Sequence, residues 1–343
     1  MRSRPQIALA LVLSSACPVA HAGWACSLDQ AFPDVSELQV EDGRLVAILG
    51  SHFSRPTKTV RNGEPTTITE HPRLSMSAGG QWEIDGYGDR PRMWYEVEKA
   101  CIDAPSDPEA AWKSIHRETP MRNAQGDWFN QSVPSCAGDG DVLWGGITFY
   151  NAEGGWGVGG LVRQDRKSGA IEFERPPELR DESAGPLAWF DGTLWLGVTG
   201  FGECAGPPGG TGLKRVQYYP QSDFYTLKDV PEACGFAIRD FQEFGGALWV
   251  ATDLGLSRLT TDGGRRWTNF MPDLEDPGLM REVGCDELYE SLLHSDDLAN
   301  TAGLDLGNAF DGFWRQLAIL RPDFMRRYMR KLHGLPTKDY PLE

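Results

Sequence analysis

Apolar and polar residues alternate along most of the chain in short runs that glycine-rich turns separate. The runs "LKRVQYY" from Leu213 and "LWVAT" from Leu248 are typical of half-buried β-strands, because successive side chains of a strand point to opposite faces. The chain has 40 Gly and 12 Trp among 343 residues, a composition that suits many short strands joined by tight turns. The pattern predicts an all-β fold over most of the chain.

An apolar pair of residues recurs at a nearly constant spacing. Its second residues lie at positions 46, 94, 144, 195 and 249, which are 48, 50, 51 and 54 residues apart. A second marker follows each pair, a strand after a tight turn: "GGQWEI", "QGDWFN", "SGAIEF", "QSDFYT" and "GRRWTN". We therefore expect a β-propeller of about five four-stranded antiparallel blades, with the pair on the second strand and the second marker on the outermost.

The fifth unit, "ALWVATDLGLSRLTTDGGRRWTNF", resembles the repeat of the propeller sensor domains found in periplasmic two-component regulators. The stretch "LWLGVTG…GLKRV" is a looser copy. The resemblance implies the propeller fold and a habit of binding ligands or partners, and it carries over no catalytic residue.

The turn in that unit, "TTDGGRRW", is similar to the Asp-box, a motif that sialidases carry. Asp262 is expected to accept backbone N–H bonds, Gly264 to permit a positive φ, and Trp267 to pack between strands. "SMSAGGQW" is a degraded copy with Ser77 in place of Asp. The motif closes a turn, so we read it as structural.

Both ends of the chain differ from this pattern. Residues 1–22 combine two arginines, the apolar run "IALALVL" and "AHA", which predicts a signal peptide cleaved near Ala22 and a periplasmic or secreted protein. Lipoprotein processing at Cys17 is the alternative. The propeller is then expected over residues 23–278.

Residues 279–343 are expected to form a helical extension, because apolar residues from Phe313 to Leu332 follow helical spacing and basic residues gather near its end. Two roles stay open for it. It either caps one face or edge of the propeller, in which case it buries its aromatic residues, or it docks a partner or a membrane surface and leaves them partly exposed.

Six cysteines remain after the predicted cleavage, an even number that suggests disulfides in an exported protein. In each of two blades, one cysteine falls in the loop between the second and third strands and another falls in the link to the next blade. This repeated placement predicts the pairs Cys101–Cys136 and Cys204–Cys234. Cys26 would then pair with Cys285. The cysteines and histidines lack the spacing of a zinc site, so we expect no metal.

The formal net charge of −16 disfavours a nucleic acid as partner, because phosphate backbones are repelled. It fits a cationic protein, a peptide or Ca²⁺, although it also serves solubility. No catalytic motif is evident, and no cofactor is expected apart from Ca²⁺ as a minor alternative.

The leading hypothesis is therefore a non-enzymatic binding protein, for instance of the inhibitor or immunity type. It would hold a protein or peptide partner of the cell envelope on the face of long loops. The candidate binding residues are Trp156, Phe201, Glu203, Arg239, Asp240 and Asp253. The alternatives are a hydrolase of carbohydrates or lactones with carboxylates or Ca²⁺ at the tunnel mouth, and a structural subunit of an envelope assembly.

Overall fold

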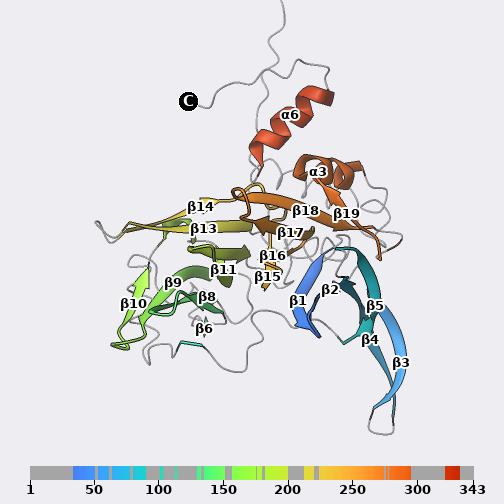
Figure 1. Ribbon diagram of the computed structural model, residues 1–343, viewed down its shortest axis with the longest axis horizontal. Helices are drawn as coiled ribbons and strands as arrows, with labels where there is room; N and C mark the ends of the chain where they lie inside the picture. The colour runs from blue at the N-terminus through green and yellow to red at the C-terminus, as the bar shows by residue number, and fades with distance from the viewer. Residues whose placement is uncertain are drawn as a thin grey trace, which may run out of the picture.

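The computed structural model describes residues 34–50, 53–61, 64–77, 80–89, 101–102, 113, 130–132, 135–150, 157–174, 176–179, 182–199, 212–219, 224–273, 276, 278–294 and 321–332. These residues form four antiparallel sheets and few helices (Figure 1). They confirm the predicted all-β propeller. The segment around Trp94, where the second of five blades is expected, lies outside the described residues, so the sheets are numbered here as blades 1, 3, 4 and 5.

Blades 1 and 3 contain five strands each. Blade 1 consists of β1 (Val35–Glu41), β2 (Arg44–Leu49), β3 (Arg55–Arg61), β4 (Glu64–Met76) and β5 (Trp82–Gly88). Blade 3 consists of β6 (Asn130–Ser132), β7 (Cys136–Gly138), β8 (Val142–Tyr150), β9 (Gly157–Asp165) and β10 (Ile171–Glu174). Both β6 and β7 pair with β8, so two short strands share the innermost position of blade 3.

Blades 4 and 5 are more regular, with their strands paired in chain order. A 3₁₀ turn, η2 (Pro177–Leu179), precedes blade 4, which consists of β11 (Ser183–Phe190), β12 (Thr193–Thr199), β13 (Gly212–Tyr219) and β14 (Phe224–Asp229). Blade 5 consists of β15 (Ile238–Phe244), β16 (Ala247–Thr252), β17 (Gly255–Thr260), β18 (Arg266–Pro272) and β19 (Met280–Val283). The chain ends in the helices α3 (Cys285–His294) and α6 (Pro322–Leu332).

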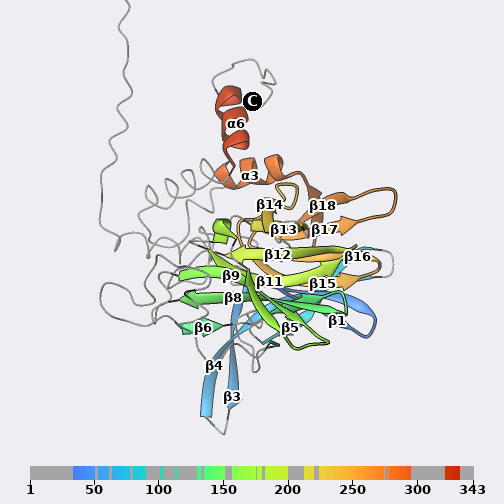
Figure 2. The same ribbon diagram turned by 90° about the vertical axis from the view of Figure 1, so that its left-hand side faces the viewer.

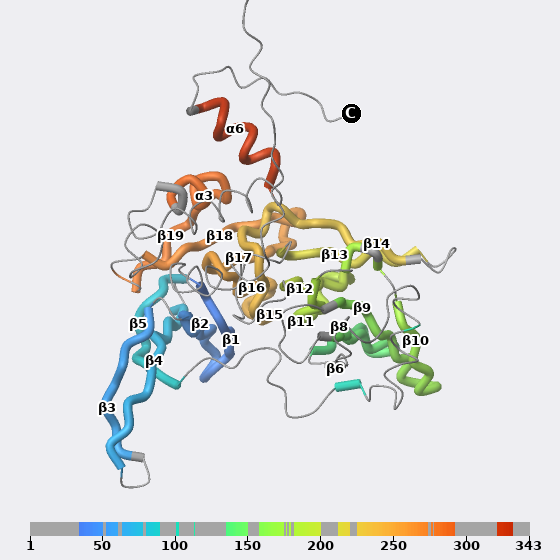
Figure 3. The backbone as a smooth tube through the Cα atoms, turned by 180° about the vertical axis from the view of Figure 1, so that it is seen from behind, coloured from blue at the N-terminus to red at the C-terminus, as the bar shows by residue number. Residues whose placement is uncertain are grey.

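The described blades pack against one another in the order 3, 4, 5 and 1. Strand β11 lies against β7 and β8 of blade 3 and against β15, and β15 lies against β1, so the last blade contacts the first (Figure 3). The predicted apolar pairs lie on the second strands of all four described blades, β2, β8, β12 and β16. The periodicity of the sequence is therefore the periodicity of the blades.

One aromatic contact repeats between neighbouring blades. The edge of an aromatic ring meets the Trp of the preceding blade's "LW" pair, with centroid distances of 5.1 Å for Tyr225 on Trp144, 5.6 Å for Trp267 on Trp195 and 5.8 Å for Trp82 on Trp249. An arginine on the third strand lies opposite each of these Trp residues: Arg163, Arg215 and Arg258. Trp82 belongs to blade 1 and Trp249 to blade 5, so the same contact joins the two ends of the ring.

The turn between β17 and β18 has the backbone that its glycines predict. Gly263 and Gly264 have φ of +78° and +115°, and the Gly264 N–H donates to Thr261 O over 3.1 Å. The Asp262 side chain is exposed and accepts no hydrogen bond from the described residues, so its Asp-box role stays a prediction. In the degraded copy, Ser77 Oγ accepts the Gln81 N–H over 3.2 Å.

A β-hairpin projects from blade 1 at the connection between its second and third strands. It consists of β3 and the first half of β4, which pair from Arg55 to Arg61, and it extends away from the ring (Figure 2). The second half of β4 returns to the blade, where it pairs with β2 and β5. We call the end of the blades that carries these second-to-third connections and the blade links the loop face. The opposite end is the turn face.

Two disulfides lie among the described residues, and they correct part of the predicted pairing. Cys101 is bonded to Cys136 as predicted, whereas Cys234 is bonded to Cys285. The predicted pairs Cys204–Cys234 and Cys26–Cys285 are therefore wrong. The reason is the unforeseen strand β19, which pairs with β18 and leads the chain to Cys285 at the start of α3, 5.3 Å from Cys234 between the Cα atoms.

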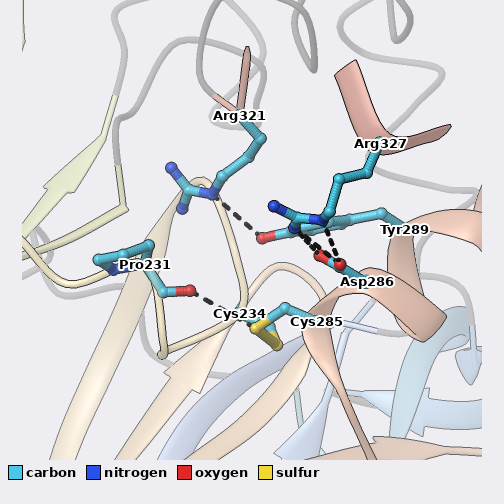
Figure 4. A network of polar contacts seen from close by, with 7 residues as sticks. All are labelled: Pro231, Cys234, Cys285, Asp286, Tyr289, Arg321 and Arg327. Carbon is cyan, nitrogen blue, oxygen red and sulfur yellow. Dashed lines mark hydrogen bonds and ion pairs between the residues drawn. A yellow bond between two sulfur atoms is a disulfide. The ribbon is translucent and has the colours of Figure 1, made fainter. Parts of the chain in front are cut away.

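The described part of the C-terminal extension covers the loop face of blade 5. Phe324, Met325 and Tyr328 of α6 are buried in one cluster with Tyr289 of α3 and Phe236 of the link before β15. Figure 4 shows the polar contacts around this cluster. Helices α3 and α6 therefore form a cap, the first of the two roles considered for this segment.

Two ion pairs join the two helices of the cap. The Arg327 guanidinium donates to both carboxylate oxygens of Asp286 over 2.7–3.0 Å, and Lys331 Nζ lies 2.6 Å from Glu290 (Figure 4 shows the first pair). Arg321 reaches the propeller itself, where it donates to Gly235 O over 3.0 Å. Part of the basic charge at this end is thus neutralised within the cap.

Candidate functional site at the seam of the ring

Three of the six predicted binding residues lie together where blade 5 meets blade 1, a junction that we call the seam. Arg239 and Asp240 stand near the start of β15, and Asp253 occupies the turn between β16 and β17. Trp156, Phe201 and Glu203 lie outside the described residues. The structure adds Asp34, which directly precedes β1 and for which the sequence analysis had no signal.

Asp253 connects its turn to the link that enters blade 5. Its Oδ1 accepts the N–H groups of Phe236 and Ala237 over 2.8 and 3.1 Å, and its own N–H donates to Ala237 O over 3.1 Å. The side chain is buried, and Oδ2 has no hydrogen-bond partner. Burial raises the pKa of Asp253 to about 6, although the charge of Arg239 and the two backbone donors act against this shift.

Asp34 holds a similar position on the side of blade 1. Its Oδ2 accepts the Ser36 hydroxyl over 2.8 Å, and its Oδ1 is buried without a partner. The carboxylate fills the space beside Gly50, where an added Cβ would lie only 1.8 Å from Oδ1. Burial raises the pKa of Asp34, while the charges of Arg239 and His71 lower it.

The buried guanidinium of Arg239 therefore acts on two buried carboxylates, and we call Arg239, Asp34 and Asp253 the seam cluster. Arg239 is almost fully buried, and its positive charge lowers the pKa of both Asp34 and Asp253. The carboxylate of Asp34 in turn raises the pKa of Asp253, since two negative charges repel. Two carboxylate oxygens without donors make the cluster able to accept hydrogen bonds from a cationic or N–H-bearing group.

The Asp240 carboxylate links blade 5 to the backbone of blade 1. Its Oδ2 accepts the Leu38 N–H of β1 over 2.8 Å, and its Oδ1 accepts the Phe241 N–H over 2.8 Å. Burial raises the pKa of Asp240 to about 6. This residue joins the innermost strands of the first and last blades, so its role here is to hold the ring closed.

No group of three or more His, Cys, Asp or Glu residues in the described part of the chain has the arrangement of a metal site. The carboxylates near Asp139, Glu182 and Asp273 do not form such a group where they are described.

No protein-family model matches this chain, and a comparison with curated proteins finds no match. Among solved structures it is similar to a Trypanosoma rangeli sialidase in complex with the inhibitor DANA, with 12% identity, a TM-score of 0.25, and coverage of 74% of this chain and 38% of the sialidase. The extracellular domain of a putative one-component system from B. thetaiotaomicron has 14% identity, a TM-score of 0.26, and coverage of 71% of this chain and 34% of that one. A GH43 endo-arabinanase from Bacillus licheniformis has 14% identity, a TM-score of 0.21, and coverage of 71% and 75%.

The chain thus spans little more than a third of the first two of these proteins. At such low identities and TM-scores, their activities carry no argument about this chain.

The raised pKa values of these buried carboxylates predict that the folded protein becomes less stable as the pH rises. Asp253 binds a proton up to about pH 6 in the folded protein but only to about pH 4 when unfolded. Its protonation stabilises the fold fully below pH 4, and this contribution is lost as the pH rises through 6, by about 3 kcal/mol in total. The variant Asp253→Asn keeps an oxygen acceptor for Phe236 and Ala237, so it should lose less stability than the wild type between pH 4.5 and pH 7.5.

Urea unfolding of both proteins at the two pH values measures this difference. Asp262→Asn, an exposed carboxylate in a turn, is the matched control and should follow the wild type. An equal loss of stability in Asp253→Asn and the wild type would contradict the buried ionisation.

Proposed function

We propose that the protein is an exported binding protein, without a reaction of its own, that holds a protein or peptide partner at the loop face of the propeller. An inhibitor or immunity-type protein is one concrete form of this function. The observation that carries the proposal is the β3–β4 hairpin, which extends from the loop face beside the seam cluster.

The hairpin is not built like the blades. Every described residue of its two strands from Arg55 to Glu70 is exposed or half-buried, and Val60 is 68% exposed. Two-stranded hairpins are marginally stable in water without further packing. A long hairpin that contributes nothing to the core is well suited to contact another molecule.

The edges of the hairpin favour contact through side chains over pairing by an added strand. Pro56 lies in β3 and Pro65 in β4, and a proline has no N–H to donate to a neighbouring strand. Lys58 adds a charge to β3, a common protection of strand edges. A partner is therefore expected to use the faces of the hairpin, where Val60 offers an apolar contact.

Export has independent support from the two disulfides, because such bonds persist in oxidising compartments and are rare in the cytosol. Within the described residues, no helix has the length and apolar character needed to cross a bilayer. The net charge of −16 favours a partner with a cationic surface. We propose cleavage near Ala22 on the grounds of the N-terminal sequence.

The variant Val60→Glu should abolish partner binding without unfolding the protein. A charge on the exposed face of the hairpin removes the apolar contact, whereas the core is not touched. The matched control is Val40→Glu, because Val40 is 45% exposed on the same blade but lies near the turn face. The measurement is non-reducing capture from envelope extract with immobilised mature protein, quantified by mass spectrometry for each variant beside the wild type.

A protein captured in stoichiometric amount by the wild type and Val40→Glu, and reduced about tenfold or more with Val60→Glu, is the expected result. Equal capture by both variants would exclude the hairpin as the site. The absence of any partner for a folded wild-type preparation would overturn the binding function.

A further inference from the structure

A cavity of about 530 Å³ lies between blades 3 and 4, at the opposite end of the blades from the hairpin. Its lining includes residues of the β7–β8 and β11–β12 connections, which join first to second strands and so belong to the turn face. The volume falls within the range of sites for small molecules. This cavity is separate from the seam cluster and from the proposed partner surface.

The cavity lies where the repeat departs from its own pattern. At the other two blade junctions, the third-strand residues that pair with Trp82 and Trp267 are Met76 and Leu259, both apolar and packed against core clusters. At the third junction the corresponding pair is Tyr218 and Tyr225, whose rings stack at a centroid distance of 4.4 Å.

Tyr218 differs from its counterparts because its side chain is open to solvent, with 38% of its surface exposed. The counterparts of Tyr218 pack against the core, so packing does not explain an exposed ring at this position. Its place on the wall of a cavity suits contact with a ligand.

The walls of the cavity are largely aromatic. Trp144, Trp189, Tyr218 and Tyr225 all line it. Trp144 and Tyr225 are buried beneath and meet edge to face, so they form a rigid support. Aromatic rings of this kind present flat apolar surfaces against which another ring can lie.

The polar groups of the cavity include both donors and an acceptor. Arg163 donates to the Tyr225 hydroxyl over 3.0 Å and pairs with Glu172, which fixes the guanidinium in place. A guanidinium has five N–H donors, so this one retains capacity for a ligand. Asp139 also lines the cavity, and its exposed carboxylate is an acceptor.

These properties together select the chemistry of the ligand. It needs a ring with an apolar face for Tyr218 and the tryptophans. It also needs groups that both donate and accept hydrogen bonds, for Asp139 and Arg163. Hydroxyl groups do both, whereas an apolar ring would leave the polar groups unpaired and a simple anion would not use the aromatic walls.

We propose that this cavity on the turn face is a binding site for a saccharide, with a pyranose ring lying against Tyr218 and its hydroxyls bonded to Arg163 and Asp139. The site is built for binding, since the residues that line it position the ring rather than attack it. Its location gives the protein two opposed surfaces, the hairpin on the loop face and the sugar site on the turn face.

The test uses the full chain and defined sugars: methyl β-glucoside, cellobiose and N,N′-diacetylchitobiose, each titrated by calorimetry and by tryptophan fluorescence. We expect saturable binding of at least one of them, accompanied by a fluorescence change because Trp144 and Trp189 line the cavity. Tyr218→Ala should weaken that binding about tenfold or more, the loss of one aromatic contact. Tyr218→Phe keeps the ring and should bind like the wild type.

Tyr87→Ala is the matched control, because Tyr87 is equally exposed at 37% but lies on blade 1. It should leave the affinity unchanged. Saturable binding that Tyr218→Ala does not weaken would place the sugar elsewhere and overturn the proposal, as would the absence of saturable binding for all three sugars. Tyr218-dependent binding of a proline-rich peptide in place of a sugar would overturn the ligand class.

Discussion

Replacing Trp249 with alanine is expected to destabilise the protein by about 4 kcal/mol, the range for a buried tryptophan that leaves a cavity. Trp249 is buried, and its ring meets Trp82 edge to face at 5.8 Å and stacks on Phe270 at 5.7 Å between centroids. The guanidinium of Arg258 lies 5.4 Å from the same ring. The substitution removes the aromatic contact that joins the last blade to the first, so the cavity opens at the seam of the ring.

Urea unfolding followed by far-UV circular dichroism measures this loss. Trp189→Ala is the control, because Trp189 is only half-buried and its removal should cost clearly less. An equal loss in the two variants would show that the seam carries no special share of the stability.

The contact at Trp249 also explains why the blades could be predicted from the sequence. In blades 3, 4 and 5, each "LW" pair packs its Leu against the core on one side of the blade and its Trp against the next blade. Leu194 and Trp195, for example, are both buried, in the clusters on either side of blade 4. A requirement that repeats in space leaves a repeat in the sequence.

Features that occur once leave a weaker trace. The β3–β4 hairpin was not predicted, although "RNGE" between two runs rich in Thr and β-branched residues is a typical hairpin turn sequence. Its charged and threonine-rich strands lack the apolar alternation by which the other strands were recognised. The innermost strand of blade 3 was also hard to foresee, because it is divided into two pieces of three residues each, β6 and β7.

The disulfides show the limit of arguing from sequence position. Cys101–Cys136 follows the geometry of blade loops and was predicted from it. Cys234 and Cys285 are 51 residues apart, and they meet only because β19 extends blade 5 and returns the chain to the link before β15. A four-residue strand with little apolar character decides this pairing.

The seam cluster was predicted in part for a similar reason. Arg239 and Asp253 stand at the loop face of a recognisable blade, so their location followed from the repeat. Asp34 comes from the other end of the chain and joins them only when the ring closes. No local pattern around Asp34 reports a partner some 200 residues away, whereas the closed ring brings its carboxylate within reach of the charge of Arg239.

The cap gives the other large expected effect: Phe324→Ala should detach α6 from the propeller. Phe324 is almost fully buried, and its ring meets Tyr289 edge to face at 5.2 Å and stacks on Tyr328 at 5.8 Å. Truncating a buried Phe costs about 3–5 kcal/mol. Since α6 is short and lies at the edge of the fold, local release of the helix costs less than global unfolding, so the variant is expected to lose the helix while the blades stay folded.

Hydrogen exchange separates these two outcomes. In Phe324→Ala, the amides of α6 should exchange much faster than in the wild type, while those of β16 and β17 keep their protection. Met329→Ala is the matched control on the same helix, because Met329 is 41% exposed and its removal should leave exchange unchanged. Loss of protection in the blades as well would mean that the cap and the propeller unfold as one unit, and unchanged exchange in α6 would mean that its ion pairs to α3, rather than the aromatic cluster, hold the cap in place.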